Sequence, residues 1–97
     1  MDLEIAVISV GEENVAELLA AMDNGGTAAL LSAPGCHSVK VLPGVENPGN
    51  VLFLVEWESA EAHAAAKDSP GFAGFHAACG PVFAKSTGGS MEHFHLR

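Results

Sequence analysis

Two short segments, Leu3–Val10 and Val51–Trp57, have the composition of β-strands and carry apolar side chains on both faces. Because successive side chains of a strand point to opposite sides, one side of the later segment carries Phe53 and Trp57 while the other carries Leu52. A sheet with one face in water would alternate apolar and polar residues instead. The chain is therefore expected to form a sheet that is covered on both faces.

The order of the other elements predicts the fold class. Ser59 and Ser69 are good N-caps for two successive helices, and Pro70 suits the first helical position. The full set of predicted elements is a strand over Leu3–Val10, a helix from Glu12 that is broken or kinked at Asp23–Gly26, a further turn or two over Thr27–Ser32, strands over His37–Leu42 and Val51–Trp57, helices over Ala60–Lys67 and from Pro70 to Phe83, and a last strand over Ser90–Leu96. This βαββαβ order predicts an α+β, ferredoxin-like domain over residues 1–97, with a four-stranded antiparallel sheet.

The apolar content is high for so short a chain. Of 97 residues, 48% are hydrophobic and only 16% are charged, although a domain of this size has little interior. The helices of a ferredoxin-like fold cover one face of its sheet only. We therefore expect a symmetric homodimer in which the second faces stack on each other.

The charge of the chain excludes several kinds of partner. A formal net charge of −8 repels nucleic acid and anionic membranes. No apolar run approaches the ~20 residues of a membrane helix, and the first residues are acidic rather than basic as in a signal peptide, so we expect a cytoplasmic protein. Cys36 and Cys79 match no zinc or redox spacing; reduced thiols are the default interpretation and a disulfide is the alternative.

The ordered motifs resemble those of the antibiotic-biosynthesis monooxygenase family. The matching segments are Pro34–Cys36, Val55–Ser59, Ser69–Phe72 followed by His76, and the closing Glu92–Phe94. The resemblance implies pairing into a dimeric α+β barrel. The family includes cofactor-independent oxygenases of polycyclic phenols as well as haem-degrading enzymes. Because the chain contains no tyrosine, a family mechanism with a tyrosine proton donor does not carry over.

Trp57 and His76 are the predicted catalytic residues. Trp57 offers a flat ring for stacking and an indole N–H donor, against the alternative of a core or interface aromatic. His76 lies within the helical stripe of Phe72, Cys79 and Phe83 and is predicted to face inward. There it is either a buried neutral histidine, a base for a phenol or enol, or a haem ligand.

Other residues are assigned secondary roles. We expect Val7, Phe53, His63 and Phe72 to contact the substrate, with His63 at a pocket rim or on the surface. His93 and His95 share one face of the last strand and would chelate a metal only if a third ligand approached, so a solvated or dimer-facing strand end is preferred and no metal is expected.

The leading hypothesis is a homodimer that binds a compact aromatic or polycyclic compound in an apolar pocket and oxygenates it without a cofactor. One alternative is haem binding or degradation through His76. The other is a non-catalytic small-ligand-binding dimer.

Overall fold

Four antiparallel strands form one sheet in the order β2-β3-β1-β4, in a computed structural model that describes residues 1–97. The strands are β1 (Asp2–Ser9), β2 (Cys36–Pro43), β3 (Asn50–Trp57) and β4 (Gly88–His95). The two central strands, β1 and β3, pair along their whole length. This order is the ferredoxin-like one, so the predicted α+β fold class is confirmed.

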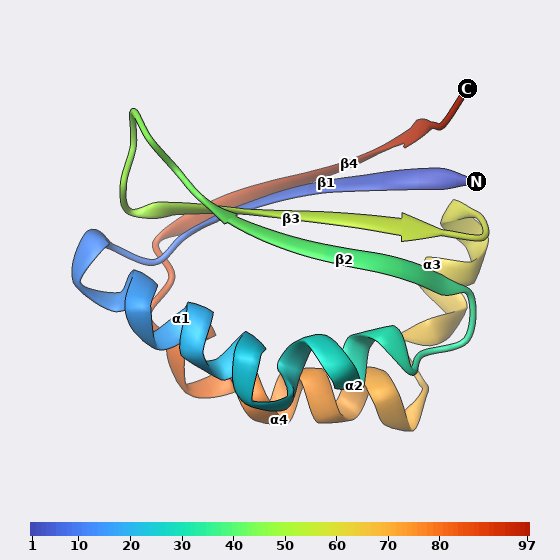
Figure 1. Cartoon of the computed structure of the whole chain (residues 1–97), viewed down its shortest axis with the longest axis horizontal. Coiled ribbons are helices and arrows are strands. Elements are labelled where there is room, and N and C mark those ends of the chain that lie inside the picture. The colour runs from blue at the N-terminus through green and yellow to red at the C-terminus, as the bar shows by residue number, and fades with distance from the viewer.

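The helices pack against one face of this sheet (Figure 1). They are α1 (Val15–Ala21), which a 3-10 turn over Glu12–Asn14 precedes, α2 (Thr27–Leu31), α3 (Ala60–Ala66) and α4 (Pro70–Phe83). Figure 1 shows α1, α2 and α4 under the sheet and α3 at the end where β3 finishes. None of the helices has the length and apolar character needed to cross a bilayer.

The predicted break between α1 and α2 is confirmed. The chain stays coiled through Met22–Gly26, but Asn24 and Gly25 leave helical geometry and Gly25 has φ of +133°. An L-residue rarely adopts that conformation, which explains why a glycine stands there.

The predicted helix starts are also confirmed. The Ser59 hydroxyl accepts a hydrogen bond from the Ala62 N–H at 3.0 Å, and the Ser69 hydroxyl accepts one from the Phe72 N–H at 3.2 Å. Each bond satisfies a backbone donor that the first turn of a helix leaves unpaired. The first cap begins α3 directly after β3, and the second begins α4, which runs under the sheet.

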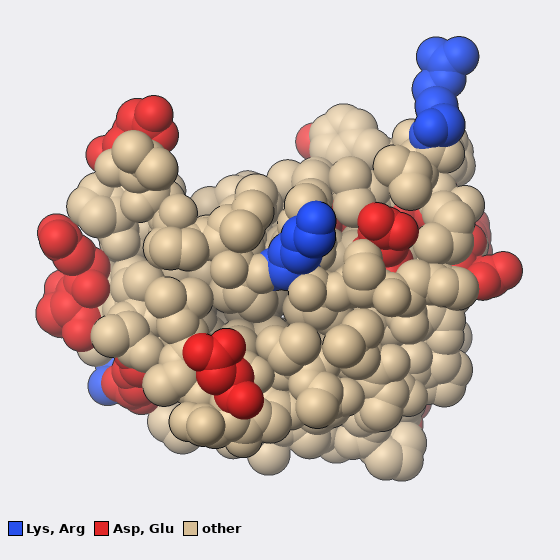
Figure 2. Space-filling model, viewed as in Figure 1, with Lys and Arg blue, Asp and Glu red and all other residues tan.

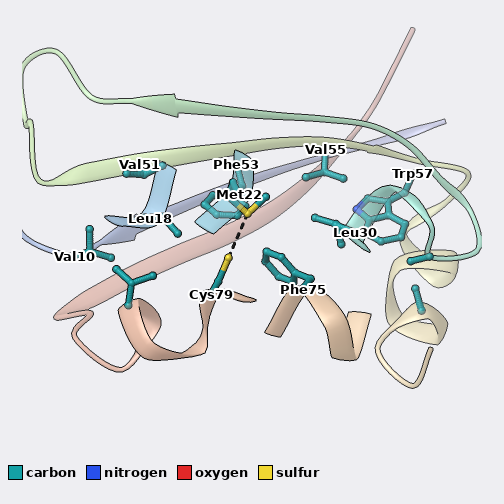
Figure 3. Packing of buried hydrophobic residues seen from close by; sticks show 13 residues of the cluster. Val10, Leu18, Met22, Leu30, Val51, Phe53, Val55, Trp57, Phe75 and Cys79 are labelled. Carbon is teal, nitrogen blue, oxygen red and sulfur yellow. Dashed lines mark hydrogen bonds between the residues drawn. The ribbon is translucent and has the colours of Figure 1, made fainter. Parts of the chain in front are cut away.

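The core lies between the sheet and the helices (Figure 3). Alternate residues of β3, from Val51 to Trp57, point into it and meet Leu18 of α1 and Phe75 of α4. Both cysteines are free thiols, and the Cys79 Sγ lies 3.3 Å from the Met22 Sδ (Figure 3).

The opposite face of the sheet has no helix over it. The register brings together the outward-pointing side chains of β1 and β3, which are Leu3, Ile5, Val7, Leu52, Leu54 and Glu56. They are only half-buried, and Leu42 and Phe94 on the edge strands are exposed. In Figure 2 few charged side chains appear at this upper surface, whose outline dips between the loop joining β2 to β3 and the C-terminus.

Candidate functional site

Trp57 ends β3 in a fully buried position. Its exposed fraction is 0%. The indole Nε1–H donates a hydrogen bond to Glu4 Oε1 at 2.9 Å, and the ring stacks on that of His63 with centroids 4.5 Å apart and 9° between the planes. The donor and one ring face that we predicted for a substrate are therefore occupied by the protein itself.

Glu4 is a candidate site residue that sequence reasoning missed. It lies on β1 opposite Val55 of β3 and His93 of β4, on the face that carries the helices, and only 9% of the residue is exposed. Loss of water raises the pKa of its carboxyl, and the Trp57 donor only partly offsets this. A buried carboxyl with a raised pKa can exchange a proton with a ligand beside it.

His63 projects from α3 into the same cluster. The expectation that it lies at a rim or on the surface is wrong, because only 5% of the residue is exposed. Its Nε2 lies 3.5 Å from Glu4 Oε1, and its Nδ1 lies 2.8 Å from His93 Nε2. Burial lowers the pKa of His63 to about 4, so the ring is neutral at physiological pH.

His93 and His95 lie on the face of the sheet that carries the helices, but only His93 is partly buried, whereas the His95 side chain is 90% exposed. Residues paired across two strands share a face, and His93 pairs with Glu4 while His95 pairs with Asp2. His93 bonds to His63, and His95 bonds to the Asp2 carboxylate, which also accepts the Ala60 N–H of α3. The preferred interpretation of a solvated strand end therefore holds for His95, but His93 lies against His63 on the side of the helices, and neither residue lies on the helix-free face. No three His, Cys, Asp or Glu side chains are arranged to hold a metal ion.

An apolar pocket of about 200 Å³ lies between β1, β3 and α4. Six of its eight lining residues are apolar: Ala6, Ile8, Phe53, Phe72, Phe75 and Phe83. The other two are Glu4, on the sheet, and His76, on the helix. A cavity of about 150 Å³ is enough to hold benzene, so this one suits a compact aromatic molecule.

His76 borders the pocket but is exposed, so the prediction that it faces away from water is wrong. It follows the buried Phe75 by one residue, which turns it about 100° around the helix axis. Its ring lies 4.9 Å from that of Phe72, centroid to centroid. An imidazole at this place can exchange protons with both the pocket and the solvent.

The structure brings some of the predicted site residues together and separates others. Phe53, Phe72 and His76 share the pocket. His63 and Trp57 do not line it, but Trp57 bonds to Glu4, which does. Val7 points to the opposite, helix-free face, where it borders a shallow hollow with Leu42 and Leu52.

The family model for antibiotic biosynthesis monooxygenases matches residues 1–78. The chain belongs to the antibiotic biosynthesis monooxygenase family. The match includes β1–β3, α3 and the part of α4 that carries His76, and so nearly all of the pocket. A search of curated protein sequences found no match.

Solved structures agree with membership of the antibiotic biosynthesis monooxygenase family. A Bordetella bronchiseptica protein proposed to be such a monooxygenase superposes with a TM-score of 0.83 at 23% identity, over 99% of this chain and 96% of its own. A heme degrader from Mycobacterium tuberculosis, with two hemes bound in its active site, superposes with a TM-score of 0.76 at 26% identity, over 99% and 95% of the two chains. At this level of identity the superpositions support the fold rather than a particular substrate.

Proposed function

We propose that this protein is a monooxygenase that oxidises a compact aromatic substrate in the pocket under α4, without a metal or flavin. The observation that carries the proposal is the pocket itself, which has an apolar wall and two proton-exchanging groups, Glu4 and His76, on opposite sides. Family membership supplies the reaction class.

The chemistry asked of the protein is proton removal from an electron-rich ring. Deprotonating a phenol gives an anion that can hand an electron to O₂. In the balanced reaction one oxygen atom enters a ring carbon as a carbonyl oxygen. The other leaves as water, with the hydrogens of the hydroxyl and of the oxidised carbon. The phenylalanine walls hold the ring in one orientation and exclude water from the anion.

In this proposal His76 is the base at the open rim that takes the proton of the oxidised ring carbon and returns it to solvent. Trp57 acts indirectly, as a positioning residue whose N–H holds Glu4 at the pocket wall. Phe53 and Phe72 contact the substrate ring, whereas His63 supports the wall from behind through the ring of Trp57.

We propose further that the active form is a cytoplasmic homodimer. Its support is the helix-free sheet face, on which Ile5 and Leu54 sit side by side and half-exposed. Burying a fully exposed side chain of this size is worth about 1.5–3 kcal/mol, so covering these half-buried ones with a second copy of the same face would gain about half of that for each. Native mass spectrometry should give twice the chain mass, and Ile5→Lys should give a folded monomer. A wild-type monomer at micromolar concentration would refute this part of the proposal.

The catalytic proposal is tested by oxygen consumption with a panel of one- and two-ring hydroxyaromatic compounds, in the presence of a metal chelator. His76→Ala should lower kcat by about 10²-fold or more, the usual effect of losing a general base. His37→Ala is the matched control, because His37 is an exposed histidine that pairs with Glu58 and does not line the pocket. Unchanged turnover and affinity in His76→Ala would refute the assignment. Binding without oxygen consumption would instead support the non-catalytic function.

Heme binding is a second candidate, favoured by the similarity to the M. tuberculosis heme degrader. The pocket of about 200 Å³ is smaller than the 300–1,000 Å³ of typical ligand pockets, so a porphyrin would extend beyond its lining residues. Titration with hemin should produce a shifted Soret band that His76→Ala abolishes if this candidate is correct.

A further inference from the structure

Glu4 has one carboxylate oxygen engaged and one free. Both contacts to its side-chain atoms, from Trp57 Nε1 and from His63 Nε2, fall on Oε1. Oε2 has no hydrogen-bond partner. Every fully buried polar side-chain atom in the chain has a partner, so Oε2 is not fully buried. Oε2 must therefore reach open space, and Glu4 borders the apolar pocket. A carboxylate oxygen that faces an otherwise apolar wall is suited to accept a hydrogen bond from a ligand hydroxyl.

A second contact series leads from Glu4 to the edge of the sheet. His63 Nε2 is 3.5 Å from Glu4 Oε1, and His63 Nδ1 is 2.8 Å from His93 Nε2. The last torsion of a glutamate is broad, so a small rotation of the carboxyl shortens the first step. His93 is only partly buried, and β4 is an edge strand. The three side chains thus connect the pocket to the protein surface.

We propose that Glu4, His63 and His93 form a proton-transfer chain that carries a proton from a ligand hydroxyl in the pocket to the surface at β4. The inference rests on the proposed function, because it assumes that the pocket holds a hydroxyaromatic ligand. It assigns the hydroxyl proton to Glu4 and leaves the ring-carbon proton to His76. The ligand class is thereby narrowed to compact aromatics that present a hydroxyl to the sheet.

Each step conserves protons. The ligand O–H breaks and its proton binds the Glu4 carboxylate, leaving the ligand anion. The protonated carboxyl then gives its proton to His63 Nε2, while the Nδ1–H of His63 passes its proton to His93 Nε2. His63 ends as the other neutral tautomer and His93 carries the positive charge until it releases a proton to water. His63 never has to be charged for long, which suits a ring whose pKa burial lowers to about 4.

Other charged and titratable groups near this chain do not interrupt it. Trp57 faces Glu4 from β3 and can only donate. Lys67, at the end of α3, acts on Glu4 and His63 by its charge alone. Cys36 of β2 stays protonated, because burial and the nearby Glu4 raise the pKa of its thiol to about 11. His95 is engaged by Asp2.

The test uses 2-naphthol, a two-ring phenol whose hydroxyl becomes strongly acidic on excitation. Its neutral and anionic forms emit at different wavelengths, so the ratio of the two bands reports proton transfer to a neighbouring acceptor. Excitation at wavelengths longer than those that Trp57, the only tryptophan, absorbs excites the probe without protein fluorescence. The full-length protein is titrated with the probe to measure affinity and band ratio together.

The wild-type complex should emit largely as the naphtholate. Glu4→Gln keeps the shape of the side chain but removes the proton acceptor, so it should lower the anion-to-neutral ratio of the bound probe at least tenfold, whatever its effect on affinity. His93→Ala, a change at a partly exposed site, should lower the ratio at least twofold, because the proton stays beside the anion and returns to it. His37→Ala should match the wild type.

The experiment distinguishes an error in the proton-transfer chain (the relay of Glu4, His63 and His93) from an error in the proposed ligand pocket. If 2-naphthol binds but Glu4→Gln leaves the ratio unchanged, Glu4 is not the acceptor and the pocket proposal stands. If His93→Ala leaves the ratio unchanged, the proton stops at Glu4 and the relay is refuted. If 2-naphthol does not bind at all, both the proposed ligand class and the relay are overturned.

Discussion

Replacing Trp57 with phenylalanine should expose how strongly the fold depends on the bond between this residue and Glu4. The substitution keeps an aromatic ring against His63 but removes the N–H that lies 2.9 Å from Glu4 Oε1. A hydrogen bond to a charged group contributes about 2 kcal/mol, and the void left by the smaller ring costs about 1 kcal/mol. We expect the free energy of unfolding to fall by about 3 kcal/mol and Tm by about 15 °C.

Two features separate this bond from ordinary core packing. The penalty should shrink as the pH falls and Glu4 becomes protonated, because the charged acceptor is then lost in both proteins. In a Glu4→Gln background the same substitution should cost about 2 kcal/mol, since a neutral acceptor replaces the carboxylate. The difference of about 1 kcal/mol is the coupling energy of the charged pair.

Urea unfolding of the four proteins gives these numbers. The transitions must be followed by far-UV circular dichroism, because Trp57 is the only tryptophan and its fluorescence disappears in the variant. Equal penalties in the wild-type and Glu4→Gln backgrounds, at every pH, would mean that the indole serves only to fill space. The reasoning about a charge-assisted bond would then be refuted.

Three further predictions concern stability and reactivity. Acidification from pH 6.5 toward 4 should lower the free energy of unfolding, and His63 accounts for up to about 3 kcal/mol of this loss, because its pKa is about 4 when folded and 6.5 when unfolded. In urea titrations at several pH values, His63→Phe should lack this part of the pH dependence. Cys36 and Cys79 should react slowly with iodoacetamide at pH 8 and rapidly in urea, as counted by mass spectrometry, since burial raises the pKa of both thiols; equal rates would contradict their burial. Gly25→Ala should lower Tm although its Cβ meets no atom, because φ there is +133°; an unchanged Tm would show that the kink relaxes freely.

The strands and helix starts were predictable because local patterns determine them. The β-strand composition of Val51–Trp57 identified β3 to within one residue, and serine at positions 59 and 69 identified the starts of α3 and α4. The kink near Gly25 followed from residues that favour a break. Each of these features depends on neighbours a few residues away in the chain.

The site depended on information that the local patterns lack. Glu4 meets His93 and Trp57 only because β1 lies between β3 and β4, and strand register cannot be read from one strand. His76 was misplaced for a different reason. The buried side of α4 is centred on Phe75 and Cys79 rather than on Phe72. His76, which follows Phe75, is therefore turned toward solvent.

One sign of the site was nevertheless present in β1. The side of this strand that carries Ala6 and Ile8 also carries Asp2 and Glu4, so two carboxylates lie in line with core residues. Burying a carboxylate costs free energy, and an amide of the same shape would accept the indole bond without that cost. The fold alone therefore gives no reason for a charge at Glu4. The proposed contact with a ligand hydroxyl would explain a carboxylate at the wall of an apolar pocket, whereas the packing around Glu4 does not.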